Sequence, residues 1–140
     1  MNRLPDWQSR LADAIRAASE RPFSYGGHDC CLAVCDCVLA ETGIDLADDI
    51  RGYCGKSEAV AVLKRYGGVA GLCETKAKIH RLAEVPPLQA QRGDVVITLE
   101  RGRDTLGIVD LGGRVTLSAA APKGWGERPL REASRAWRIG

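Results

Sequence analysis

A histidine, an aspartate and a cysteine follow one another where an apolar stretch begins, and these residue types can carry out nucleophilic chemistry. They are His28, Asp29 and Cys30. Asp29 is predicted to be a helix N-cap, because a short carboxylate there accepts the free backbone N–H groups of the first turn. Cys30 would then lie at the positive end of the helix dipole, which favours the nucleophilic thiolate. The run therefore indicates a thiol site with Cys30 as nucleophile, His28 either as its base or as a structural loop histidine, and Asp29 as cap or orienter.

The helix that must position this thiol is predicted over residues 30–42. Asp36 is the one polar side chain among its first eleven positions, and a helix that is apolar nearly all round is typically buried. Gly43 is predicted to end it as a left-handed C′ glycine. Gly26 and Gly27 predict a turn just before it. The sequence therefore places the thiol at the start of a central helix.

Composition limits the classes of protein to consider. The chain has 140 residues, of which 45% are hydrophobic and 27% charged, which is typical of one globular domain. A net charge of +2 gives no reason to expect nucleic-acid binding. No apolar run approaches the roughly 20 residues that a membrane span needs. The first residues lack the apolar core of an export signal, so the thiols are expected to stay reduced.

The other cysteines raise the question of a metal site. The six are Cys30, Cys31, Cys35, Cys37, Cys54 and Cys73. The first four wind around one helix, where adjacent side chains point about 100° apart, so they do not converge on one ion. Small buried hydrophobic side chains are the expected role, although Cys54 or Cys73 could supply extra ligands. No metal and no cofactor are expected, and three nearby aspartates, Asp45, Asp48 and Asp49, are expected to be caps and solvated groups.

The order of the predicted elements indicates an α+β fold in one domain, 1–140. The parts are an N-terminal helix in 1–21 (helical over 5–20), the central cysteine helix in 22–43, a helical connection in 44–91 and an antiparallel sheet in 92–140. In the connection, helices are predicted from Ser57 to Gly67 and over 69–79. Strands are predicted at 95–99, 106–109, 114–117 and 137–139, with 100–104 as a hairpin connection. Helices followed by antiparallel strands are typical of α+β proteins.

Three motifs in this order resemble those of a known family. Asp29-Cys30 opens the central helix, Gly93-Asp94 opens the first long strand, and the run 105–108 corresponds to a His-x-Gly-Ile strand. In these features the chain resembles the NlpC-type cell-wall endopeptidase superfamily, whose members have a papain-like fold. It is more closely similar to short phage tail-associated proteins, which share a Gly-x-His-Asp-Cys-Cys run and an Ala-Trp-Arg-Val-like end, here residues 136–139.

The chain departs from the family at the positions that a hydrolase needs. The family histidine falls on Thr105, and the third, orienting polar residue falls near Ser118. A papain-type thiol needs a base within hydrogen-bonding reach, and a threonine hydroxyl does not exchange protons readily near neutral pH. Only His28 and His80 supply imidazoles, and His80 lies in an unanchored stretch expected at the surface.

Two functions therefore remain open. The resemblance with its missing histidine implies a catalytically degenerate phage tail-tip component that is made in the host cytoplasm and docks to other tail-tip or hub proteins. The alternative is an active thiol peptidoglycan endopeptidase or amidase that uses Cys30 on the host cell wall during DNA entry. Retention of His28 and Asp29 beside the thiol favours this second interpretation.

Overall fold

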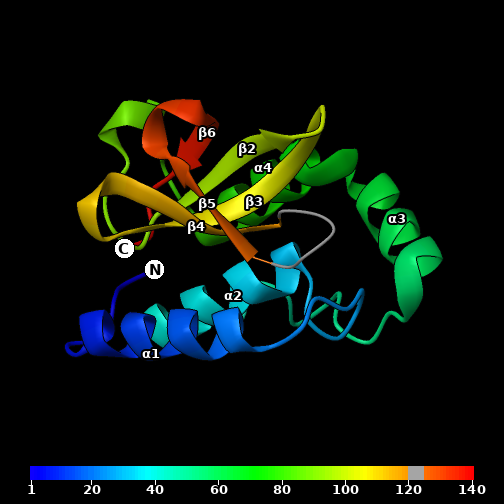
Figure 1. Cartoon of the computed structure of the whole chain (residues 1–140), viewed down its shortest axis with the longest axis horizontal. Coiled ribbons are helices and arrows are strands. Elements are labelled where there is room, and N and C mark those ends of the chain that lie inside the picture. Colours follow the sequence, from blue (N-terminus) through cyan, green and yellow to red (C-terminus); the bar gives the residue numbers. More distant parts are fainter. Residues whose placement is uncertain (120–124) are drawn as a thin grey trace.

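The computed structural model describes residues 1–119 and 125–140, and over these it has four α-helices and one six-stranded sheet (Figure 1). The helices are α1 (Trp7–Glu20), α2 (Cys30–Thr42), α3 (Gly55–Tyr66) and α4 (Gly68–His80). The strands are β1 (Glu84–Val85), β2 (Val95–Glu100), β3 (Arg103–Asp110), β4 (Arg114–Ala119), β5 (Trp125–Pro129) and β6 (Ala133–Trp137). The short 3₁₀ turns are η1 (Pro87–Gln89), η2 (Leu111–Gly113) and η3 (Leu130–Glu132). The prediction of an α+β fold is confirmed.

The strands pair in the order β1-β6-β2-β3-β4-β5, and every pairing is antiparallel. The β2–β3 hairpin is regular from Val95↔Ile108 to Glu100↔Arg103. Successive side chains of a strand point to opposite faces, so this register fixes which residues of β3 face the helices.

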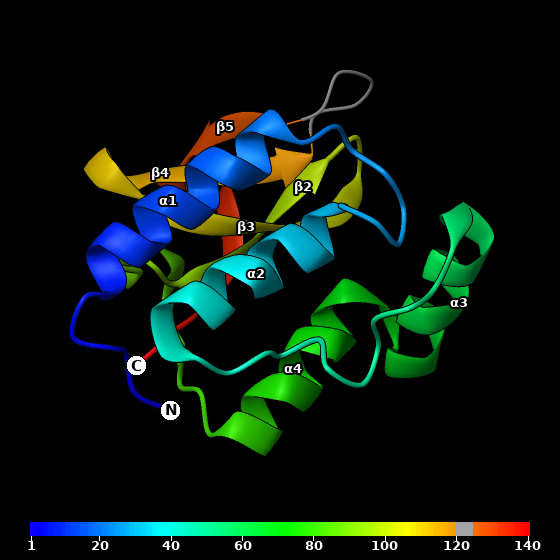
Figure 2. The same cartoon turned by 90° about the horizontal axis from the view of Figure 1, so that it is seen from below.

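The helices pack against one face of the sheet (Figures 1 and 2). α1 lies along α2, α2 covers β3 and β4, and α4 covers β3, while α3 packs on α4 at the periphery. Leu106 and Ile108 of β3 share the main core with residues of α1, α2 and α4. A smaller apolar cluster on the other face includes Val96, Val109 and Val115. Both faces of the central strands are therefore buried.

α2 is the central helix that the sequence predicts. Its bounds match the prediction, and most of its residues are buried, including Leu32, Val34 and Val38. Gly43 ends it with φ of 79°, and the Gly43 backbone N–H donates to the Leu39 carbonyl at 2.8 Å. A Cβ would disfavour this left-handed conformation, which explains glycine there.

The predicted boundaries are wrong in the second half of the chain. The hairpin connection is only Arg101-Gly102, both with positive φ, because the strands continue to Glu100 and restart at Arg103. The last strand ends at Trp137 rather than spanning 137–139. Strand β5 is not among the predicted strands, because a sequence with Gly126 and Pro129 lacks the alternating apolar pattern of a strand. It lies at the edge of the sheet, where proline is tolerated.

The described helices include none long and apolar enough to cross a membrane. The two ends of the chain lie near each other in both views (Figures 1 and 2).

Candidate functional site

Cys30 is the first residue of α2, and Asp29 holds it there. The Asp29 carboxylate accepts the Leu32 backbone N–H at 2.9 Å, and the Asp29 carbonyl accepts the Ala33 N–H at 2.8 Å. This is N-cap geometry, in which the side chain satisfies a donor that the helix leaves free. The cap fixes the thiol at the N-terminus of the helix.

The loop before α2 is fixed by the second oxygen of the same carboxylate. Asp29 Oδ2 accepts the Gly26 backbone N–H at 3.1 Å and the Tyr53 hydroxyl. Gly26 has φ of 82°, and a Cβ there would collide with the Tyr53 carbonyl. Asp29 is therefore occupied by three donors and does not orient an imidazole. Its contact with Tyr53, 24 positions away, has no signal in the sequence.

His28 is buried, with 2% of its surface exposed, and its ring is engaged elsewhere. Its Nε2 donates to the Ala18 carbonyl near the end of α1 at 2.8 Å. That bond requires a proton on Nε2, which leaves Nδ1 as the acceptor in the neutral ring. Nδ1 is buried and has no hydrogen-bond partner among the described residues. Neither nitrogen of His28 therefore hydrogen-bonds the Cys30 thiol.

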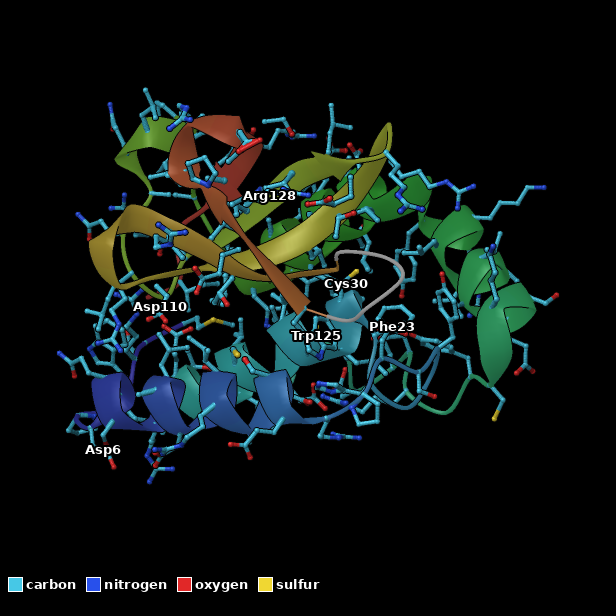
Figure 3. All side chains as sticks on the ribbon, in the orientation of Figure 1. Asp6, Phe23, Cys30, Asp110, Trp125 and Arg128 are labelled. Carbon is cyan, nitrogen blue, oxygen red and sulfur yellow. The ribbon has the colours of Figure 1, made fainter. Side chains whose placement is uncertain are left out.

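Aromatic rings surround this end of α2, and the sequence does not show that they meet. The Trp125 ring packs edge-on to His28, with centroids 4.8 Å apart, and lies 5.8 Å from Phe23. Its Nε1 donates to the Arg21 carbonyl at 2.9 Å. Figure 3 shows Phe23, Cys30 and Trp125 gathered where the loop, α2 and β5 meet. This packing ties β5 to the end of α1 and encloses the His28 ring.

Burial dominates the electrostatics of the thiol. It raises the pKa of Cys30 to about 11, and the nearby Asp29 carboxylate adds to the rise, while a hydrogen bond with the Leu106 backbone opposes it. The helix N-terminus was expected to favour the thiolate, but desolvation outweighs that effect. Cys30 is half-buried and is a neutral thiol at physiological pH.

Thr105 lies on the sheet face away from the thiol. Leu106 and Ile108 face the helices, so Thr105 and Gly107 alternate to the other face. A Cβ on Gly107 would meet Val115 of the second cluster, which confirms that position 107 faces away from the helices. The Thr105 hydroxyl is buried and lies 3.4 Å from the Arg103 carbonyl, to which it donates. A base at position 105 would therefore not face Cys30.

The remaining predicted positions do not complete a catalytic set. The backbone of Ser118 pairs with Gly126, and its side chain is outside the described residues. His80 is half-buried and is the last residue of α4, about two turns beyond Cys73. The structure therefore brings Cys30, Asp29 and His28 together along the backbone without linking their side chains into a relay.

Three other thiols face the interior between α2 and α4. Cys31, Cys35 and Cys73 line an apolar cavity of about 40 Å³, together with Lys76. Burial raises the pKa of Cys73 to about 12, and contact with Cys35 together with burial raises the pKa of Cys31. These three thiols pack as small apolar groups. None of the six cysteines is in a disulfide.

No metal centre forms in the part of the chain that the structure describes, where no group of three or more histidine, cysteine, aspartate and glutamate side chains could hold an ion. Asp45 accepts the Ala47 N–H at 3.0 Å and pairs with Arg51, and Asp49 pairs with Lys76. Two of the three aspartates are therefore used in a turn and in ion pairs, and Asp48 is exposed.

A capped thiol at a helix N-terminus can attack a carbonyl, but the described residues place no proton acceptor in hydrogen-bonding contact with it. No curated protein matches the chain in sequence. A family model described as "Domain of unknown function (DUF6950)" matches residues 2–139. Because this match covers nearly the whole chain, the chain belongs to the DUF6950 family.

Proposed function

We propose that this chain is a component of a phage tail tip, built on an NlpC-type papain-like scaffold that has lost hydrolytic activity. It would be made in the host cytoplasm and enter the virion tail through contacts with other tail-tip or hub proteins. The resemblance of Asp29-Cys30, Gly93-Asp94 and the C-terminal Ala-Trp-Arg-Ile to those proteins supports the proposal. So does the order of the elements, with a buried cysteine helix ahead of an antiparallel sheet.

The observation that carries the loss of activity is the bond between His28 and Ala18. Nε2 of this ring donates to a backbone carbonyl, and Nδ1 is enclosed without a partner. A thiol that attacks an amide must pass a proton to the leaving amine, and a positioned acid–base group contributes roughly 10²–10⁴ in rate. With His28 occupied and Thr105 facing away, neither of these two positions supplies Cys30 with an acid–base group.

The alternative is an active peptidoglycan endopeptidase or amidase. One observation favours it: Cys30 is half-buried at the helix N-terminus, and the Leu106 backbone acts to lower the pKa of its thiol. That placement suits a nucleophile if a partner protein supplies the base.

One set of variants distinguishes the two functions. Purified wild type, Cys30→Ala and Cys54→Ala are tested on cell-wall fragments, and the same variants are tested for assembly of infectious particles. Cys54 is exposed and precedes α3, outside α2, which makes its variant the matched control. We expect no cleavage by any of them and full assembly by both variants, whereas deletion of the protein should stop assembly. Cleavage by wild type and Cys54→Ala, but not by Cys30→Ala, would instead establish the enzyme.

A further inference from the structure

A buried ion network fastens the segment before α1, residues 1–6, to the rest of the molecule. The Arg3 guanidinium donates to Glu41 at 3.2 Å, to Asp94 at 3.2 Å and to the Arg92 carbonyl at 2.9 Å. The Cζ atom of Arg3 lies 4.1 Å from the centre of the Trp7 ring. One side chain of this segment thus contacts α2, the turn before β2 and α1.

The backbone of the segment is attached at the same place. The Leu4 N–H donates to the Glu41 carbonyl at 2.7 Å, and this carbonyl lies in the last turn of α2, where helical partners are missing. A Cβ on Gly93 would collide with Glu41 Oε1, and one on Gly140 would lie 3.0 Å from Arg3. Glycines therefore allow the chain to close tightly over the network.

Glu41 is the unusual member of this network. Its side chain has no exposed surface, and while Oε1 accepts from Arg3, Oε2 has no hydrogen-bond partner among the described residues. Asp94 is equally buried, but both of its oxygens are paired, by Arg3, Arg138 and backbone N–H groups. An ionised carboxylate with an unpaired buried oxygen is costly, so Glu41 favours a bound proton.

Charged and titratable groups reach Glu41 from each neighbouring element. Arg3 lies on the segment, Cys37 one turn earlier on α2, and Arg92 and Asp94 before β2, with Asp110 paired to Arg92 at 3.3 Å. Burial raises the pKa of Glu41 to about 8, Arg3 and Arg92 oppose the rise, and Asp94 adds to it. Burial is the largest of these effects on the pKa of Glu41 and outweighs the nearby arginines.

We propose that residues 1–6 form a strap latched by Arg3, and that Glu41 couples this latch to pH: the closed strap keeps a proton on Glu41, and opening the strap releases that proton to water. The proposal goes beyond the tail-tip function and does not depend on it. Opening exposes Glu41 to water, where its carboxyl ionises with a pKa near the usual 4.5. Between the two pKa values the open form binds fewer protons, so rising pH favours opening.

Amide hydrogen exchange at Leu4 tests the latch, because its N–H is bonded to Glu41 only while the strap is closed. The protection factor, which corrects for intrinsic base catalysis, is measured from pH 5 to 9 in wild type, Glu41→Gln and Asp13→Asn. Asp13 is an exposed carboxylate on α1, paired with Arg16, and is the matched control. In wild type and in the control, we expect the protection factor of the Leu4 amide to fall by up to tenfold per pH unit until about pH 8 and to stay constant above that pH. Glu41→Gln should show no such fall.

A second measurement keeps the proposal open to refutation if Glu41→Gln does not fold. Wild-type exchange at Leu4 and at Ala33, inside α2, is repeated in low urea. A strap that opens alone exposes little surface, so protection at Leu4 should not respond to urea, whereas protection at Ala33 should fall. Protection at Leu4 that is flat with pH, that falls equally in Glu41→Gln, or that follows Ala33 in urea overturns the proposal.

Discussion

The imidazole of His28 donates to the carbonyl of Ala18 and thereby joins the end of α1 to the start of α2. The bond spans ten positions and crosses the turn that contains Gly26 and Gly27. The Ala18 carbonyl also accepts the Arg21 N–H at 3.2 Å, so His28 completes a bifurcated acceptor. A histidine beside a catalytic-looking cysteine thus has a structural role.

Replacement of His28 should lower stability. His28→Phe keeps an aromatic ring against Trp125 but removes the donor to Ala18, and we expect a loss of about 1–2 kcal/mol in the free energy of unfolding. Urea denaturation measures the loss. His80→Phe, at the end of α4, is the control and should change stability by less than about 0.5 kcal/mol. Equal losses for the two variants would contradict the role assigned to the Ala18 bond.

Alkylation of Cys30 should report a neutral, partly shielded thiol. Because burial raises its pKa to about 11, the rate of reaction with iodoacetamide should increase roughly tenfold per pH unit from pH 7 to 10. Peptide mapping by mass spectrometry separates Cys30 from the exposed Cys54, which should react first at pH 7. A catalytic thiolate–imidazolium pair would behave differently, with a rate that is already constant near pH 7.

The central helix could be predicted from the sequence because its signals are local. Asp29, the apolar run and Gly43 lie within fifteen consecutive positions, and each acts through its immediate neighbours. The strands of the β2–β3 hairpin could be predicted for the same reason, because the run of β-branched residues at 95–98 is itself a local signal. These residues are buried on both faces of the sheet. The connection predicted over 100–104 is longer than the two-residue turn of the structure, because its charged residues resemble a loop.

The contacts that decide the chemistry are not local, which is why the sequence did not reveal them. Tyr53 reaches Asp29, Trp125 encloses His28, and Arg3 reaches Asp94 across 91 positions. From the sequence, Gly93-Asp94 is predicted as the start of the first long strand and not as the anchor of both chain ends. The face of the sheet to which Thr105 points depends on the register of β3 against β2, and a shift of one residue would turn it to the other face.

Gly93 should tolerate no side chain. Its φ is 90°, and a Cβ would collide with Glu41 Oε1, which Arg3 holds in place. We expect Gly93→Ala to cost about 3 kcal/mol, from backbone strain together with disruption of the buried hydrogen bond between Arg3 and Glu41. Gly112 also has positive φ, 71°, but has open space around it, so Gly112→Ala should cost only about 1 kcal/mol. Thermal denaturation of the two variants compares them, and equal losses would exclude the steric contribution.

Global stability should be greatest near pH 5. The pKa of Glu41 is raised to about 8, so the folded state binds more protons than the unfolded chain between pH 4.5 and 8, and stability falls as pH rises through this range. The slope is at most about 1.4 kcal/mol per pH unit. Below this range, stability instead falls as pH falls. Arg51 lowers the pKa of Asp45, and Lys76 lowers the pKa of Asp49. Their ion pairs are lost as these carboxylates become protonated.

Urea denaturation of wild type and Glu41→Gln at pH 5, 6.5 and 8 tests this dependence. The variant has an uncharged side chain of the same shape, so its stability should stay nearly constant from pH 5 to 8 and should exceed that of wild type at pH 8. Asp13→Asn, which removes an exposed carboxylate, should keep the wild-type slope. A wild-type stability that stays level from pH 5 to 8 would mean that Glu41 is already ionised in the folded protein, held so by Arg3. In that case Arg3→Gln, which removes this cation, should restore the falling slope.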